Sequence, residues 1–235
     1  MFYTIECRSV VDFGERVVPR ANGTLVWEGE HYFARMQNQE LIDNVPVFDH
    51  FFLQTTDTLK PETWEWLIQD VHRFSGREKP PIIGWFISDY FRQVLEQFVI
   101  APPYRFYPAK LKYKNSKLDY FIFNLLWIKL ETIIDFDALK FSIAEGYPKE
   151  KVGPYNQPIR NKSELDEVKI SFYKQKKELQ LDSVVVTEYF DFVPLYGINS
   201  DIIITERLKQ AIEKSRIEGV IIKEAPYQIR MKDQA

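Results

Sequence analysis

The chain has 235 residues, of which 45% are hydrophobic and 15% aromatic, so it can bury a large core and is not disordered as a whole. This length allows one large domain or two packed lobes. Its 31 lysine and arginine residues nearly balance 34 aspartate and glutamate residues, for a net charge of −3. The single cysteine, Cys7, excludes a disulfide framework, and we expect it to be a small buried hydrophobe.

The dense group of basic residues in the sequence comprises Lys110, Lys112, Lys114 and Lys117. It alternates with Leu111 and Tyr113, which is typical of the solvated face of a strand and its turn. Nucleic acid is therefore not an expected partner, because phosphate binding needs a positive footprint. The sequence shows neither an export signal nor an apolar stretch of the about 18 residues that cross a membrane. We expect a cytoplasmic protein that does not bind membranes.

The first fifty residues favour β structure. The Asn-Gly pair at 22–23 predicts a tight hairpin turn between strands at 17–18 and 25–27. Another strand is expected at 45–53, and Pro46 favours placing it at a sheet edge, because proline cannot donate a backbone hydrogen bond.

A helix is predicted from Pro61 to Gly76, because proline is tolerated in the first helical turn and apolar residues follow at helical spacing. That apolar stripe comprises Trp64, Leu67, Ile68, Val71 and Phe74.

Trp66 lies on the opposite side of this predicted helix, in a row with Glu62 and Asp70 and beside Arg73. An aromatic residue off the core stripe and ringed by charges is typical of an interface anchor. We therefore predict that these four residues bind a protein partner. The alternative is that a second layer, such as the N-terminal hairpin, covers Trp66.

The middle of the chain predicts a strand at 84–87, a helix capped by Ser88 that runs to 98, and a strand at 104–107. A further buried strand is expected at 120–127. Residues 149–162 contain Gly153, Pro154 and Pro158, a composition that predicts a linker.

This linker would separate an N-terminal lobe (1–148) from a C-terminal lobe (163–235). In the second lobe, Ser163 is expected to open a helix to about residue 178. Strands at 184–192 and 201–204, a helix at 206–214 and a strand at 219–222 complete the prediction.

An internal repeat relates residues 87–100 to residues 204–217 without gaps. Four of the fourteen pairs are identical, namely Ile87/Ile204, Gln93/Gln210, Glu96/Glu213 and Ile100/Ile217. Each copy predicts a strand, a hydroxyl cap, an acidic first turn and an amphipathic helix that leads into another strand. Either the unit is duplicated, or both copies are ordinary capped helices between strands. We expect an α+β fold of mixed sheets with capped helices.

The sequence contains no nucleophile elbow, phosphate loop, dinucleotide fingerprint or paired-histidine zinc helix. His31, His50 and His72 stand isolated among aromatic or apolar neighbours. Asp49 and His50 are adjacent and would point to opposite faces of a strand, which favours a structural role for His50. We expect no cofactor, metal or small-molecule ligand.

Asp135 and Asp137 offer an enzymatic alternative. On a strand, the two carboxylates would share one face and could divide acid and base roles in a hydrolase or transferase. The simpler interpretation is that the strand ends here, with one aspartate capping a helical turn at Ala138 and Leu139.

Several stretches resemble a bacterial immunity-protein family of polymorphic toxin systems, formerly catalogued as a domain of unknown function. The resemblance covers roughly residues 80–226. Its segments are 87–95, 107–109, 120–125, 134–137, 187–191, 202–212 and 217–220. Residues before 80 have no counterpart in that family.

The resemblance implies a protein that binds and neutralises a cognate bacterial toxin, and it supplies no catalytic residues. Mild acidity would suit a basic toxin, although a net charge of −3 is too small to decide this. The alternatives are the enzyme that uses Asp135 and Asp137, and a structural or scaffold protein without a toxin partner.

Overall fold

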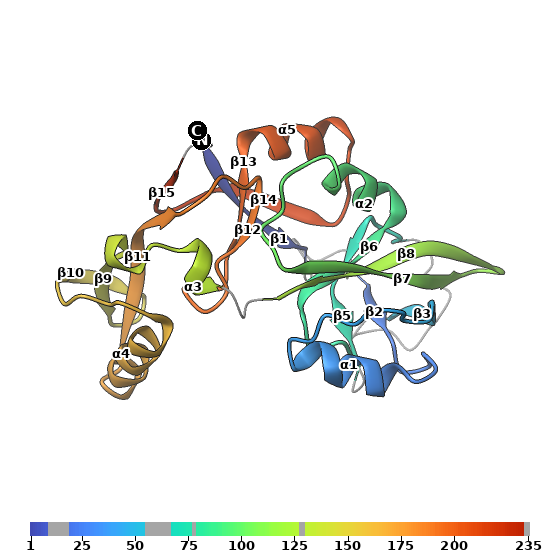
Figure 1. Cartoon of the computed structure of the whole chain (residues 1–235), viewed down its shortest axis with the longest axis horizontal. Coiled ribbons are helices and arrows are strands. Elements are labelled where there is room, and N and C mark those ends of the chain that lie inside the picture. Colours follow the sequence, from blue (N-terminus) through green and yellow to red (C-terminus); the bar gives the residue numbers. More distant parts are fainter. Residues whose placement is uncertain (9–18, 55–66, 77–78, 127–129, 233–235) are drawn as a thin grey trace.

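The computed structural model describes residues 1–8, 19–54, 67–76, 79–126 and 130–232. Their helices are α1 (Gly29–Gln37), α2 (Asp89–Leu95), α3 (Leu130–Ile133), α4 (Lys162–Lys174) and α5 (Glu206–Lys214), together with a 3-10 turn at Phe136–Ala138. The strands form three mixed or antiparallel sheets, which confirms the expected α+β class (Figure 1).

The seven-stranded sheet lies on the right in Figure 1, with α1 below it. Its strands, in spatial order, are β4 (Val71–His72), β6 (Ile83–Ser88), β8 (Ser116–Leu125), β7 (Tyr104–Tyr113), β3 (Phe48–Gln54), β2 (Arg20–Asn22) and β5 (Phe74–Ser75).

A central sheet and an outer sheet complete the molecule. The central sheet has the order β12 (Phe192–Pro194), β13 (Ile202–Thr205), β1 (Phe2–Cys7) and β14 (Val220–Glu224). The outer sheet, on the left in Figure 1 beside α4, has the order β10 (Glu150–Tyr155), β9 (Lys140–Glu145), β11 (Lys177–Val186) and β15 (Gln228–Met231).

The internal repeat is a structural duplication. In the first unit, β6 and β7 are both antiparallel to β8, which lies between them, and α2 connects β6 to β7. In the second unit, β13 and β14 are both antiparallel to β1, and α5 connects them. β4 flanks β6 as β12 flanks β13. The chain order is permuted, because the middle strand of the second unit precedes all its neighbours in sequence.

Both helices of the duplication begin at a hydroxyl cap, as predicted. The Ser88 Oγ accepts a hydrogen bond from the Phe91 N–H at 3.1 Å, and the Thr205 Oγ1 accepts one from the Leu208 N–H at 3.4 Å. A side chain in this position satisfies one of the free N–H groups of the first turn.

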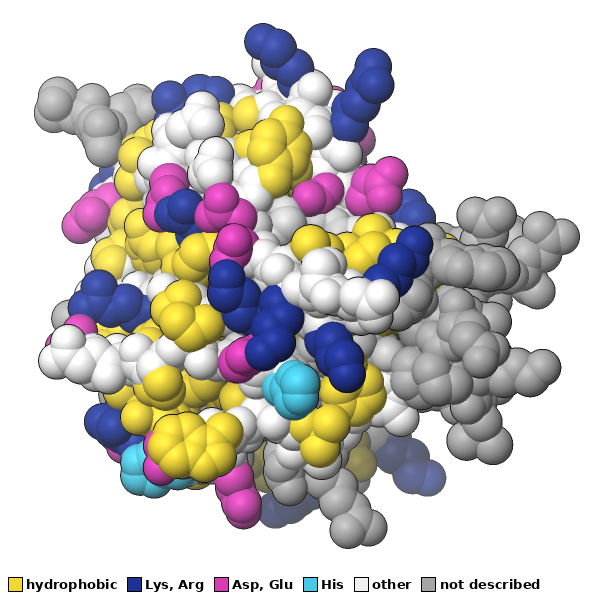
Figure 2. Space-filling model, turned by 90° about the vertical axis from the view of Figure 1, so that its right-hand side faces the viewer, with side chains coloured by type: hydrophobic (Ala, Val, Ile, Leu, Met, Phe, Trp, Pro, Cys, Tyr) yellow, Lys and Arg dark blue, Asp and Glu magenta, His cyan; other side chains and the backbone are white. Residues whose placement is uncertain are grey.

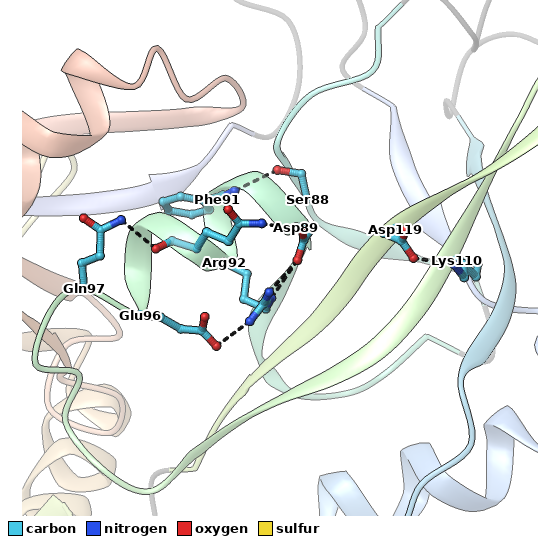
Figure 3. A network of polar contacts seen from close by, with 9 residues as sticks. Ser88, Asp89, Phe91, Arg92, Glu96, Gln97, Lys110 and Asp119 are labelled. Carbon is cyan, nitrogen blue, oxygen red and sulfur yellow. Dashed lines mark hydrogen bonds and ion pairs between the residues drawn. The ribbon is translucent and has the colours of Figure 1, made fainter.

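Arg92 bridges two acidic residues along α2 (Figure 3) and also contacts the sheet. Its guanidinium pairs with Asp89 at 2.7 Å and with Glu96 at 2.6 Å, one turn away on either side. The same group lies 4.7 Å from the centroid of the Phe121 ring on β8, within the range of a cation–π contact.

Lys209 repeats this arrangement on α5. Its ammonium pairs with Glu206 and Glu213 at 3.9 and 3.1 Å and lies 4.9 Å from the centroid of the Tyr3 ring. Since Tyr3 pairs with Ile204 as Phe121 pairs with Ile87, the two cations occupy equivalent places. The two copies therefore share tertiary contacts as well as sequence.

The two units pack on each other through one hydrophobic cluster. The first unit contributes residues such as Ile87, Phe91, Leu95 and Phe123, and the second contributes Ile5, Ile204, Leu208 and Ile212. Cys7 lies in the same cluster with 1% of its surface exposed, and burial raises the pKa of its thiol to about 12. It is a buried hydrophobe, as expected.

Asp70 fastens the first unit to the second. Its Oδ1 accepts a hydrogen bond from the Ser88 Oγ at 2.6 Å within the first unit. Its Oδ2 accepts one from the backbone N–H of Glu218 at 2.9 Å, directly after α5 of the second unit.

Asp191 makes the reciprocal contacts from the second unit. Its Oδ1 accepts a hydrogen bond from the Thr205 Oγ1 at 2.8 Å, and its Oδ2 accepts one from the Val99 N–H at 3.0 Å, after α2. Burial alone would raise the pKa of Asp191, but these bonds and the Arg207 guanidinium hold it below the usual value. Two equivalent carboxylates, one in each unit, thus accept hydrogen bonds from both units and hold them together.

The predicted N-terminal hairpin is wrong in its described part. Asn22 ends β2, and its Oδ1 accepts a hydrogen bond from the Thr24 N–H at 2.8 Å. Residues 24–28 then form turns that lead into α1. The expected strand at 17–18 lies outside the described residues. Strand β3 is confirmed, but it lies between β7 and β2 and not at an edge. Pro46 precedes the strand and so costs it no hydrogen bond.

The expected linker at 149–162 contains strand β10, which pairs with β9 through Glu150 to Tyr155. The sheets do not divide at this point, because β1 pairs with strands from the C-terminal part of the chain. The helix expected from Ser163 is α4, and its cap is Asn161, whose Oδ1 accepts a hydrogen bond from the Glu164 N–H at 2.9 Å.

Candidate functional site

A groove of about 930 Å³ opens where the central sheet meets the segment between β5 and β6. Its walls come from separate parts of the chain: β1, the end of α1, residues 79–85, residues 196–202 and the end of β14. Ligand sites are concave and combine apolar walls with a few placed polar groups, so this groove is the best candidate for a binding site among the described residues.

Opposite charges alternate along the groove. Glu6 on β1 lies between two cations, with Arg73 Nη2 at 3.9 Å and Lys223 Nζ at 3.1 Å. All three side chains are at least 43% exposed, so water screens these pairs and they add little to stability. They remain available to a charged partner.

Asp201 is the most perturbed carboxyl group of the groove. Burial raises its pKa, the nearby Glu6 charge raises it further, and the Tyr227 hydrogen bond lowers it in part. The Asp201 Oδ2 accepts hydrogen bonds from Tyr227 Oη at 2.8 Å and from Asn199 Nδ2 at 2.7 Å. A carboxyl group with a shifted pKa in a concave site is a common feature of functional sites.

The remaining wall is apolar. Pro80, Pro81 and Ile82, which precede β6, line the groove, as does Tyr196 in the turn before β13, with 41% of its surface exposed. Apolar and charged residues in one lining resemble the core and rim of a protein interface.

The predicted helix at 61–76 is wrong over its described part. Residues 67–70 have no regular structure, and β4 and β5 follow. Glu62 and Trp66 lie outside the described residues. Asp70 and Arg73 are therefore not brought together on one helical face. Asp70 clasps the two units, whereas Arg73 lines the groove and donates its Nε–H to the Cys7 carbonyl at 3.1 Å.

Tertiary pairing explains this error. Val71 and His72 pair with Ile87 and Phe86 on β6, and Val71 has none of its surface exposed. The apolar spacing that suggested a helix was produced by a short buried strand next to a loop, and such short runs do not distinguish the two.

Asp135 and Asp137 lie at a turn and not on a strand. Asp135 occupies the position before the 3-10 turn Phe136–Ala138, and Asp137 lies within that turn. Asp135 makes no capping hydrogen bond, and its carboxylate is 3.8 Å from Lys232 Nζ. The strand geometry that would place both carboxylates on one face is absent, and the expected capping bond is absent too.

The three histidines lie in separate environments. His31 is exposed on α1, whereas His72 is fully buried on β4. His50 lies at a bulge of β3 with φ of 81°, a backbone conformation that is rare for residues other than glycine. Its N–H donates to Asp49 Oδ1 at 2.7 Å, and its buried Nδ1 has no hydrogen-bond partner among the described residues.

The basic hairpin of β7 and β8 is solvated, as predicted. Lys110 pairs with Asp119, and Lys117 pairs with Asp49, while Leu111 is buried on the opposite face. Figure 2 shows that basic side chains at this end of the molecule are interspersed with acidic and apolar ones.

Sequence reasoning missed one exposed aromatic residue and one hydrogen-bonded pair that includes a groove residue. Trp27 is 76% exposed directly before α1, but the predicted hairpin placed it on a strand. Asp201 and Tyr227 meet only in the folded chain. Asp191 precedes its strand as Asp70 precedes β4, but the ungapped repeat does not align the two, because Asp70 lies 17 residues before Ile87 and Asp191 lies 13 residues before Ile204.

No group of three or more histidine, cysteine, aspartate or glutamate residues in the described ranges is placed to hold a metal ion. Among the same residues, no helix has the length and apolar character needed to span a bilayer. No protein-family model matches the chain, and no curated protein matches it.

Proposed function

We propose that this protein is an immunity protein that binds a cognate bacterial toxin domain and neutralises it by direct contact. The observation that carries the proposal is the groove, in which cations, carboxylates and an apolar wall face one open space of about 930 Å³. The resemblance over residues 80–226 supports the same function.

The composition of the groove suits a protein segment better than a compact ligand. Glu6, Asp201 and Glu224 supply negative charge, and Arg73, Lys79 and Lys223 supply positive charge along the same walls. Such a surface is complementary to a loop or strand that carries both signs, and charge complementarity contributes mostly to specificity and association rate.

The test is protection and binding. Cells that express the toxin encoded beside this gene should survive only when this chain is co-expressed. Purified chain should bind the catalytically inactivated toxin domain in calorimetry. If the wild-type chain neither protects nor binds, the proposed function is wrong.

Groove variants locate the interaction. Tyr196→Ala together with Lys223→Glu should weaken toxin binding by about 2 kcal/mol or more if these side chains belong to the energetic centre of the interface. The matched control changes the same residue types outside the groove, in Tyr173→Ala with Lys174→Glu on α4, and should bind as the wild type does. Equal affinities of the two double variants would place the interface elsewhere.

A further inference from the structure

β14 forms one edge of the central sheet, with β1 on its inner side. The Arg8 N–H donates to the Gly219 carbonyl at 2.8 Å, and the Ala225 N–H donates to the Phe2 carbonyl at 3.2 Å. In an antiparallel pair, bonded and non-bonded positions alternate. The odd-numbered residues of β14 therefore bond to β1, and the backbone groups of Val220, Ile222 and Glu224 point away from it.

These outward groups have no hydrogen-bond partner among the described residues. A row of unpaired N–H and C=O groups is a template for another strand, and folded proteins usually cover or interrupt it. Lys223 and Glu224 are exposed, while Val220 and Ile222 are half-buried against the core. The edge is thus apolar in its first part and charged at its end.

The duplication shows how the equivalent edge is used in the first unit. There β7 takes the place of β14, and its outer edge pairs in parallel with β3, beginning at Phe48 opposite Ala109. The stretch of β7 before that point is joined to the same segment by the Arg105–Asp43 ion pair at 3.2 Å.

The β7 residue equivalent to Glu224 is Pro108, since Pro108 pairs with Phe121 as Glu224 pairs with Tyr3. β3 therefore covers the part of β7 that follows the stretch equivalent to β14, and among the described residues no strand pairs with the outer side of that stretch itself.

We propose that the open edge of β14 receives an extended segment of the partner protein as an added strand. This inference rests on the proposed function, because the occupant is a segment of the toxin domain. Lys223 and Glu224 also line the groove, so an added strand would run along its wall. Side chains beside Val220 and Ile222 would be apolar, since neighbouring residues on one face of a sheet pack together.

Amide exchange followed by NMR tests the edge residue by residue. In the free, dilute protein, the amides of Ile221 and Lys223 should exchange slowly, and those of Val220, Ile222 and Glu224 quickly. Binding of the inactivated toxin domain should slow these three amides by at least tenfold. Slow exchange in the free protein would mean that the edge is already covered, which would overturn the inference whatever binds.

Two variants at position 224 distinguish the contribution of the backbone N–H to toxin binding from the contribution of the side chain. Glu224→Pro removes an outward N–H while keeping an extended conformation that proline tolerates at an edge, and should weaken toxin binding at least tenfold. Glu224→Ala loses the same side-chain charge but keeps the N–H, so Glu224→Pro should bind the toxin at least tenfold more weakly than Glu224→Ala does. Equal affinities of the two variants, with melting temperatures like that of the wild type, would overturn the inference.

The outcomes distinguish the occupant from the function. If the toxin domain binds but does not slow the amide exchange of β14, the proposed function stands and the inference of an added strand is overturned. If amide exchange on β14 slows as the concentration of the toxin-free protein rises, the occupant of the edge is a second copy of this chain, and the inference is overturned. Absence of toxin binding by the wild-type chain would overturn both.

Discussion

His72 shows how a single buried side chain fixes its own protonation state. Its Nδ1 lies 3.0 Å from the Pro19 carbonyl oxygen, and its Nε2 accepts a hydrogen bond from the Gln69 N–H at 3.2 Å. Nδ1 must therefore carry the proton, and a second proton on Nε2 would face another donor. Burial lowers the pKa of His72 to about 4, against an ordinary value of 6.5.

This shift predicts a loss of stability in mild acid. Between pH 6.5 and 4 the unfolded chain binds a proton at His72 that the folded protein excludes. The free energy of unfolding therefore decreases as the pH is lowered, by up to about 1.4 kcal/mol per pH unit. His72→Phe should remove this part of the pH dependence, measured by urea unfolding at pH 7, 6, 5 and 4. An unchanged slope in the variant would assign the dependence to other groups.

Asp135 and Asp137 are the residues on which the enzymatic alternative depends. Their position at an exposed turn predicts that Asp135→Asn with Asp137→Asn leaves protection against the toxin unchanged within twofold, because neither residue lies in the groove. Survival of toxin-expressing cells measures this. Loss of protection by a double variant that folds normally would favour the carboxylate chemistry.

At the scale of single residues, the sequence predicted the features that depend only on neighbouring residues in the chain, such as helix caps. Ser88 and Thr205 were recognisable as caps, since a hydroxyl before an acidic first turn needs only three residues to act. The surroundings of Asp201 and the bulge at His50 depend on contacts with distant parts of the chain, and no local pattern indicated them.

At the scale of elements, β6, α2 and β7 were predictable together, because a cap, an amphipathic stripe and a break are all local signals. The helix expected from Pro61 failed because Val71 and His72 belong to a strand that β6 completes. The prediction of a linker at 149–162 overlooked β10 for a similar reason, because strand pairing depends on a distant part of the chain. β10 contains Gly153 and Pro154 and still pairs with β9, since proline is tolerated at a sheet edge.

Repetition was the one non-local property that the sequence revealed. It indicated two similar elements, but not that α2 and α5 pack on each other or that the middle strands come from different places in the chain. The groove could not be predicted, since its walls meet only after β1 and β14 have paired.

At the scale of the whole molecule, the two reciprocal carboxylates join one unit to the other, alongside backbone hydrogen bonds such as the one from the Val71 N–H to the Glu218 carbonyl at 3.1 Å. Asp191→Asn should lower the free energy of unfolding by about 3 kcal/mol, the usual result of breaking a buried charged network. Asp70→Asn should cost about 1 kcal/mol, because Asp70 is partly exposed and loses weaker contacts. Chemical denaturation measures both.

The same two variants carry a specific signature. Because each carboxylate bonds to the opposite unit, Asp191→Asn should speed amide exchange at Val99, and Asp70→Asn should speed it at Glu218. Faster exchange confined to the unit that carries the substitution would show that the clasps act only within their own unit.

The permuted order of the second unit has a consequence for synthesis on the ribosome. About 200 residues separate Tyr3 from its neighbour Ile204 in the sheet, so β1 is synthesised long before β13 and β14 and stays without these partners until they have been made. The first unit has all its strands by residue 125 and can form early, as earlier segments generally do. Pairing over such a separation is slow, so β1 finds its place in the central sheet long after its own synthesis.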